Sequence, residues 1–534
     1  MIGLYFRVTN KQKADLEVSQ EIKAIYEKDI NDVDRVYTDL GGKEPPPPPY
    51  IPPTPTLPEV KEQDLITSGG NVTNKSSAGV IEIAWLDLEN NVIENPLPPN
   101  VVTGMTPIKW DGTTEENTTT SDTNWYNYQA QTGANDGHTS MWANARTNNN
   151  DYLVWIPRYA YKITYFGGAT DQEAINNANY YRANGRTGDF QESWITGYST
   201  VYGMIVKEGN DYKLVEGTAR DITNKVQTTG YTDYIPHPAF TNEGNNGFGE
   251  LKGIWVGKFE SSSSTPTATN GGGNVTTLDV KIVPNVPSWR VIQVSNIFTV
   301  CQVFAANNSL SNIDSHMMKN TEWGAVAYLT HSRYGRNGTE VRINNNNGFY
   351  TGWGASSDNA SNVTYSASST DNLWTGQYGQ LASTTGNTTG IYDMSGGAYE
   401  YTAAYIDNGH SNLTTYCSSL KIAAEKYKDR YAYGSPDNQA NNYTANASRY
   451  GDAVYETSTS GTGATSWFSD YSYFPSSSAP VFRRGGYYDD GTYAGLFNFN
   501  FYYRQFGQRL RVSYSSLSTL ICGTEFRNLL KHPK

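Results

Sequence analysis

Residues 483–504 of this chain read RRGGYYDDGTYAGLFNFNFYYR. A frame of small and apolar residues suits tight turns over a packed floor, and it comprises Gly485, Gly486, Gly491, Ala494, Gly495, Leu496 and Phe497. Between them stand Tyr, Asp, Asn, Phe and Arg side chains, which give rigid contact area and adaptable hydrogen bonding. The segment is therefore typical of a binding surface on a scaffold rather than of a catalytic centre.

The interspersed residues are the candidate ligand contacts. They are Tyr487, Tyr488, Asp489, Asp490, Tyr493, Asn498, Asn500, Phe501, Tyr502, Tyr503, Arg504 and Phe506. Arg484, Gly485 and Gly486 are expected to be structural, because a guanidinium can brace the segment through its fork of donors. The alternative is that the aromatic rings pack against one another in a Tyr-rich domain, although a dense exposed cluster of rings is costly unless it binds something.

The composition favours a loop-rich protein with short strands. Of 534 residues only 17% are charged, whereas Gly numbers 50 and Tyr 41. A net charge of -12 argues against a nucleic-acid partner, which needs a basic stripe. The three cysteines and six histidines show no metal-ligand spacing, so neither a metal site nor a cofactor is expected.

The N-terminal part resembles an attachment device. Residues 1–44 carry apolar side chains at helical spacing, which predicts an amphipathic helix that either self-associates as a coiled coil, for example a homotrimer, or lies against the next domain. Residues 45–62 are proline-rich and are expected to form a stiff polyproline II spacer. The apolar start 1–6 is too short for a signal peptide, which favours assembly on a particle inside a cell and release by lysis over loss of a longer membrane helix.

The rest of the chain is predicted to alternate short strands with polar loops. Strands are expected at 81–88, 152–165 and 253–260, and a helix at 319–329 with Asn320 or Thr321 as its cap. We divide this part into a small β segment (63–109), a main domain (110–514) and a C-terminal tail (515–534).

Four segments in order resemble a known family. They are 254–260 (IWVGKFE), 320–329 (NTEWGAVAYL), 390–401 (GIYDMSGGAYEY), and the pair RGG at 484–486 with LRV at 510–512. Together they are similar to the formylglycine-generating-enzyme type of C-type-lectin fold (the sulfatase-modifying-factor fold), which implies an α+β domain with few helices and long loops. The enzymes of that family carry paired copper-binding cysteines soon after the RGG, but 487–506 contains no cysteine. The resemblance thus implies the fold without the oxidation, and a copper oxidase remains a remote alternative.

The chain also resembles the variable proteins of diversity-generating retroelements. These combine a lectin-type fold and an RGG-to-RV C-terminal segment with binding residues at codons rewritten by adenine-directed mutagenesis. Tyr487, Asp489, Tyr493 and most other candidate contacts are reachable from an Asn codon by changing adenines, whereas Gln505 and Gln508 are not. The ending 507–512 (GQRLRV) also departs from the usual GFRV. The resemblance places the variable region at about 480–512.

Relatives of this kind look characteristic of phages and of Gram-positive bacteria. The resemblance implies a non-enzymatic ligand-binding or adhesion protein: a receptor-binding protein at a phage tail tip, on the virion, or an adhesin at a bacterial cell surface. Its partners would be a protein or glycan of a target cell and, through the N-terminal helix, a phage tail or cell-surface anchoring partner. The structural alternative is a fibre or pilin-like subunit.

Two pairs of acidic residues could have either a structural role or a metal-binding role. Asp393 and Glu400 could form an acid-base pair or lie near a structural calcium ion, but turn capping and salt bridging are the favoured roles. Asp489 and Asp490 before Gly491 could begin a calcium loop, although a lone DDG supplies too few oxygen ligands and favours a turn.

Overall fold

The run 152–165, expected to be one strand, forms two strands that enter different sheets. These are β5 (Tyr152–Pro157) and β6 (Tyr159–Tyr165), and Arg158 lies between them. Arg158 is fully buried, where it donates to two backbone carbonyl groups and forms an ion pair with Glu250 at 2.7 Å. A buried guanidinium needs such partners, so Arg158 fixes the point at which the chain passes from one sheet to the other.

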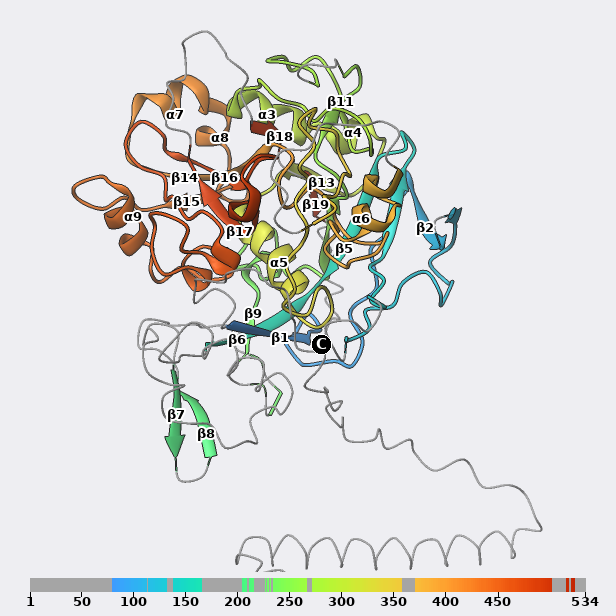
Figure 1. Cartoon of the computed structure of the whole chain (residues 1–534), viewed down its shortest axis with the longest axis horizontal. Helices are drawn as coiled ribbons and strands as arrows, with labels where there is room; N and C mark the ends of the chain where they lie inside the picture. The colour runs from blue at the N-terminus through green and yellow to red at the C-terminus, as the bar shows by residue number, and fades with distance from the viewer. Residues whose placement is uncertain are drawn as a thin grey trace, which may run out of the picture. The chain divides into compact units, whose positions relative to one another are not determined.

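The computed structural model describes 79–112, 114–131, 138–165, 204–208, 211–215, 226, 228–229, 231, 234–266, 271–357, 370–501, 515–517 and 520–523. The described residues belong to one compact unit (Figure 1). Short strands and few helices make it an α+β structure, as the sequence indicates. The predicted N-terminal helix (1–44) and proline-rich linker (45–62) lie outside the described residues.

The largest sheet has seven strands in the order β13-β19-β10-β5-β4-β2-β3, and all neighbours in it are antiparallel. Its other strands are β2 (Met105–Asp111), β3 (Thr114–Asn117), β4 (Asn144–Thr147), β10 (Gly253–Gly257), β13 (Asp314–Met317) and β19 (Leu520–Gly523).

The second sheet is built on β14 (Tyr399–Ile406), which is buried along its whole length. β14 pairs in parallel with β15 (Asp429–Tyr431) and β18 (Ser515–Leu517), and antiparallel with β16 (Val481–Gly485). β17 (Gly495–Asn500) pairs antiparallel with β16 and forms the edge that carries the predicted binding segment.

Three smaller sheets complete the strands of the described residues. β6 pairs with β1 (Gly79–Trp85) and β9 (Ile235–Pro236), β11 (Ser262–Ser263) pairs with β12 (Val280–Lys281), and β7 (Met204–Glu208) pairs with β8 (Asp211–Val215).

The described helices are short. They are α3 (Val294–Gln302), α4 (Phe304–Asn307), α5 (Asn320–His331), α6 (Gln377–Gln380), α7 (Ser411–Tyr416), α8 (Ser418–Ile422) and α9 (Gln439–Ala445). Single 3-10 turns are η4 (Pro238–Phe240), η5 (Thr370–Asn372), η6 (Glu425–Tyr427), η7 (Tyr455–Thr457), η8 (Trp467–Ser469) and η9 (Gly491–Tyr493).

The helix α5 confirms the expected element but not its expected cap. Lys319 is the cap residue, and its backbone N–H donates to the Glu322 carboxylate at 2.8 Å. Thr321 already lies in the first turn, where its N–H donates to Asp429 of β15 at 2.8 Å. A carboxylate from another element therefore satisfies a free amide of the helix start, a role that local sequence does not reveal.

α5 is buried on every side and packs against β1 of the three-stranded sheet and β14 of the second large sheet (Figure 1). On one side Tyr159 donates its hydroxyl to the Ala325 carbonyl oxygen at 2.6 Å, and on the other the Trp323 indole donates to the Leu496 carbonyl oxygen at 2.7 Å. A helix that is covered all round shows no single apolar stripe, which matches the mixed sequence NTEWGAVAYLTH.

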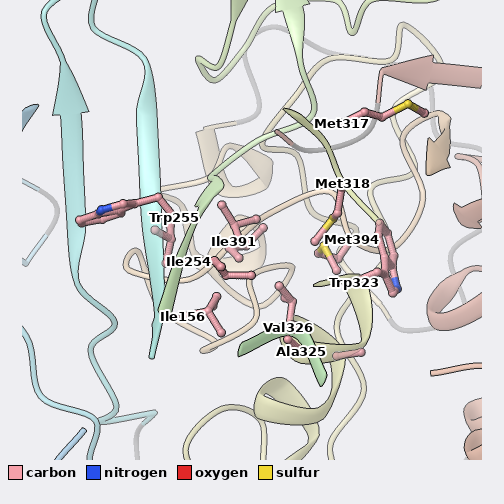
Figure 2. Close-up of a cluster of buried hydrophobic side chains, with 14 of the residues drawn as sticks. Ile156, Ile254, Trp255, Met317, Met318, Trp323, Ala325, Val326, Ile391 and Met394 are labelled. Carbon is pink, nitrogen blue, oxygen red and sulfur yellow. The ribbon is translucent and has the colours of Figure 1, made fainter. Parts of the chain in front are cut away.

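The core beside α5 gathers aliphatic side chains from distant segments. Figure 2 shows Ile156 and Ile254, from adjacent strands, on the same side of the sheet as Ile391 and Val326, whereas Trp255 points to the opposite side of β10. All five side chains are buried, so this sheet is covered on both faces.

Several sheets contain strands from both sides of an expected segment boundary. β1, from the predicted 63–109 segment, pairs with β6, and β2 runs through the predicted boundary at 109/110. At the other end β18 and β19 pair with β14, β10 and β13. Strands from the described parts of 63–109 and 515–534 thus pair with strands of 110–514.

Candidate ligand-binding surface

The surface is held by the last residues of β16. Gly485 and Gly486 have φ values of +80° and +79°, a region that other residues rarely adopt. A Cβ on Gly486 would also lie 2.6 Å from Ala494. The Gly485 carbonyl accepts from the Gly396 N–H at 3.0 Å, which ties the turn to the 390–401 segment. The backbone at this turn therefore favours glycine at both positions.

Arg484 lies beneath this turn. It is fully buried, and its guanidinium donates to the carbonyl oxygens of Asp452, Ala453 and Leu496 at 3.2, 2.9 and 3.3 Å. Burial lowers the pKa of Arg484 to about 10, and nearby acids oppose that shift. The side chain joins β16, β17 and the 452–453 segment below the surface.

The loop from Tyr487 to Tyr493 presents side chains outward. Tyr487 and Tyr488 are half-buried, Asp489 is exposed and Tyr493 is 40% exposed. The loop backbone is fixed, because the Tyr488 N–H donates to the Gly397 carbonyl at 3.0 Å. A fixed backbone lowers the entropy that is lost when such side chains bind.

The Asp490 side chain joins the end of the loop to its start and to Tyr399. Its Oδ2 accepts from the Tyr487 N–H at 3.1 Å and from the Tyr399 hydroxyl at 2.8 Å. Burial raises the pKa of Asp490 to about 6, although these two hydrogen bonds act in the opposite direction. The carboxyl is therefore a brace of the loop that titrates in mildly acidic solution.

A continuous row of four rings underlies the loop, with the buried rings Tyr399 and Phe349 at its ends and the half-buried Tyr487 and Tyr488 between them. Tyr399 lies 5.2 Å from Tyr487, Tyr487 lies 5.3 Å from Tyr488, and Tyr488 lies 4.9 Å from Phe349, all between ring centroids. Arginines cover both ends: Arg483 is 4.0 Å from the Tyr399 ring, and Arg290 is 3.9 Å from the Phe349 ring. The cations and neighbouring rings hold Tyr487 and Tyr488 in place at their inner edges.

A second group of rings surrounds Tyr493. Its ring stacks on Tyr471 at 4.3 Å and 12°, and Tyr471 in turn lies 5.4 Å from Tyr473. Tyr471 and Tyr473 are half-buried. Sequence reasoning missed them, although their alternate spacing just before β16 is the pattern of an extended segment that shows one face.

Tyr399, Phe349 and Arg290 were also missed by sequence reasoning. Tyr399 belongs to the 390–401 motif, but nothing in a single sequence pairs it with Asp490. Phe349 and Arg290 come from loops more than a hundred residues away along the chain. Only the fold brings these side chains to the RGG turn.

Two of the proposed ligand contacts are buried: Asn498 on β17, and Phe501 just after that strand. Asn498 is fully buried, and its amide donates to the Tyr493 carbonyl oxygen at 2.7 Å. Phe501 is 8% exposed, and Asn500 is half-buried. Both faces of β17 are covered, so its alternate residues do not form an outward row, and Asn498 supports Tyr493 from below instead. Tyr502, Tyr503, Arg504 and Phe506 lie outside the described residues.

Asp393 and Glu400 are buried in the fold. Asp393 adopts φ +64°, and its carboxylate accepts from the Gly352 N–H at 2.9 Å, the Glu260 N–H at 3.1 Å and the Asn344 amide at 2.9 Å. Burial raises the pKa of Asp393 to about 6. Glu400 lies opposite Arg484 in the β14–β16 pair. The Asp393 carboxylate therefore satisfies N–H groups of three separate segments.

These residues do not fit a calcium ion. Both Asp393 carboxylate oxygens already accept N–H donors, and Asp490 uses its Oδ2 twice. Within the described residues, no group of three or more His, Cys, Asp or Glu side chains is arranged to hold a metal. The arrangement can bind through rings, amides and carboxylates, and we assign no metal chemistry to it.

No family model matches the chain, and no curated protein matches it. Of the helices among the described residues, none has the length and apolar character needed to cross a membrane.

Proposed function

We propose that this protein is a non-enzymatic ligand-binding or adhesion protein, and that Tyr487, Tyr488, Asp489 and Tyr493 form part of its binding surface. We further propose a C-type-lectin-like fold whose C-terminal region is diversified by a retroelement. Display would be at a phage tail tip or on a bacterial cell surface, toward a protein or glycan of a target cell.

One observation carries this proposal: residues 484–499 separate into two layers. Arg484, Leu496, Phe497, Asn498 and Phe499 are buried and fix the backbone, whereas Tyr487, Asp489 and Tyr493 reach solvent. Because the two sets hardly overlap, the outer side chains can change without disturbing the inner ones. Binding by such a surface depends on a few desolvated aromatic anchors rather than on total area.

Cys301 and Cys417, the cysteines whose side chains the structure describes, favour binding over oxidation. Cys301 and Cys417 are buried, and burial raises the pKa of the Cys301 thiol and brings that of Cys417 to about 12. A copper-thiolate site needs the opposite, an accessible thiol with a lowered pKa.

The binding surface is tested by replacing Tyr487 and Tyr493 with Ala. Labelled protein is titrated onto a panel of Gram-positive gut bacteria and bound cells are counted by flow cytometry. On any strain that the unmodified protein binds, we expect affinity to fall about thirty-fold, the effect of losing one strong anchor. The matched control is Tyr433→Ala, because Tyr433 is 52% exposed and lies outside the surface. Unchanged binding, or a large fall in melting temperature for the double variant, contradicts the proposal.

The retroelement is tested on DNA. We expect a near-copy of the codons for 480–512 that differs mainly at adenines, with a reverse transcriptase gene beside it. Absence of both would remove diversification from the proposal and leave the binding surface to be judged by the cell experiment.

A further inference from the structure

A second recess, on a different part of the fold, shares no residue with the surface above. It has a volume of about 580 Å³ and lies where β1 meets the 94–96 and 120–130 loops. That volume falls within the range of ordinary small-molecule sites, about 300–1,000 Å³.

The floor of the recess is aromatic. Trp85 lies 4.7 Å from Tyr334 and 5.6 Å from Tyr128, and Tyr128 lies 5.7 Å from Tyr126. Trp85 and Tyr128 are buried, so they give the floor its rigidity, whereas Tyr126 and Tyr334 are half-buried and offer ring surface. The two accessible rings, Tyr126 and Tyr334, form an open aromatic surface on a rigid base. They do not enclose a ligand from three or four sides, as an aromatic cage for a quaternary ammonium group does.

The rim of the recess is polar and exposed. It carries the side chains of Glu94, Asn95, Thr120, Thr123 and Asn127, which offer hydroxyl, amide and carboxylate groups. These groups both donate and accept hydrogen bonds within one small opening.

The rim loop is held in shape from below. Asp122 accepts from Thr118 and forms an ion pair with Lys109 at 2.9 Å, and the Asp122 carbonyl accepts from the Trp125 N–H at 3.1 Å. Asn127 and Met141 exchange two backbone hydrogen bonds at 2.7 and 2.8 Å. A rim that is already ordered loses little entropy when a ligand binds.

We propose that this recess binds one uncharged hexopyranose ring of a glycan. A pyranose has an apolar C–H face that packs on Tyr126 and Tyr334, and equatorial hydroxyls that match the donors and acceptors of the rim. Its lining contains no Lys, Arg or His, and the charged residues in it are Glu94 and Asp122, so it disfavours sialic acids, uronic acids and phosphate. This inference does not depend on the proposed binding surface.

Saturation-transfer NMR of the full chain tests the inference with methyl glycosides of glucose, galactose, mannose and N-acetylglucosamine. At least one is expected to receive saturation at the protons of its C–H face. Tyr126→Ala is expected to weaken that binding about ten-fold, while Tyr433→Ala leaves it unchanged. Asn95→Ala, at the exposed rim, is expected to weaken glycoside binding several-fold. This variant tests the inference if Tyr126→Ala fails to fold.

Three results overturn the inference. One is that no methyl glycoside binds. Another is that binding occurs but neither Tyr126→Ala nor Asn95→Ala changes it. The third is that choline or N-acetylneuraminic acid, included as comparison probes, binds more tightly than every neutral glycoside.

Discussion

At the scale of single residues, the proposed binding segment contains two sets of side chains. Buried side chains hold the backbone in place, and a second set reaches solvent. Arg484 and Asn498 satisfy backbone carbonyl groups from below, and Asp490 ties the loop to Tyr399. Each brace is a polar group taken out of water, which is costly unless its partners are supplied. Asp489 and Tyr493 stay in contact with water, so their polar groups do not depend on partners within the protein.

Asp490 makes the stability of the protein depend on pH. A carboxyl whose pKa is raised on folding to about 6, from the ordinary 3.8, binds protons more tightly in the folded state. Its contribution is therefore present at low pH and is lost as pH rises through that window. We expect the free energy of unfolding of the unmodified protein, relative to Asp490→Asn, to fall by about 1 to 3 kcal/mol from pH 4 to pH 7.

Urea denaturation across that pH range measures this difference. Glu260 and Asp393 also have raised pKa values through burial, so the comparison with the variant isolates Asp490 from them. Asp371→Asn is the control, because Asp371 is exposed and is not among the groups that shift the pKa of Asp490. Parallel stability curves for Asp490→Asn and the unmodified protein would falsify the assignment.

Sequence reasoning at this scale succeeds where backbone geometry limits the residue choice. Gly485 and Gly486 are foreseeable, because their turn excludes side chains. The inward direction of Asn498 is not foreseeable, because a strand with both faces covered has no polar row to mark its outer side. The partners Tyr399 and Phe349 depend on which loops the fold brings together.

At the scale of elements, α5 shows how burial overrides helix propensity. The helix is foreseeable from the pattern of 319–329, but Gly324 in its middle looks like a flaw, since Gly costs about 1 kcal/mol relative to Ala in a helix. In the structure a Cβ on Gly324 would lie 2.1 Å from the Gly451 carbonyl oxygen. The glycine is there because another segment of backbone crosses the helix at that point.

We therefore expect Gly324→Ala to destabilise the protein despite its better propensity. The clash with backbone cannot be relieved by rotating a side chain, and overpacking of this kind costs about 1 to 3 kcal/mol or more. Equilibrium denaturation should show a net loss of about 2 kcal/mol.

Gly409→Ala is the matched comparison for this change. A Cβ there meets nothing within 4 Å, so only its φ of +72° opposes the substitution. Its cost should be about 1 kcal/mol. A Gly324→Ala variant as stable as the unmodified protein would show that the 451 segment can move away from α5.

At the scale of the whole molecule, the described end of the chain completes both larger sheets. β19 lies between β10 and β13 in the seven-stranded sheet, and β18 pairs with β14 in the other. The sequence analysis assigned 515–534 to a C-terminal tail. Long-range strand pairing of this kind cannot be read from local pattern, since the partners are some 200 residues away for β13 and some 270 for β10.

We expect deletion of 515–534 to abolish the cooperative unfolding transition or to lower the free energy of unfolding by more than about 5 kcal/mol. Without β19, the backbone N–H and C=O groups of β10 and β13 lose their common partner in the interior of a sheet, where water does not replace it. Hydrogen exchange followed by mass spectrometry measures the loss of these hydrogen bonds. We expect lost protection at Ile254–Val256 and Asp314–Met317, the partners of β19. Deletion of 524–534 is the comparison, because it leaves the β18 and β19 pairings intact. If the shorter chain keeps full protection at both strands, then β19 is dispensable and the boundary expected at 514/515 is the true edge of the domain.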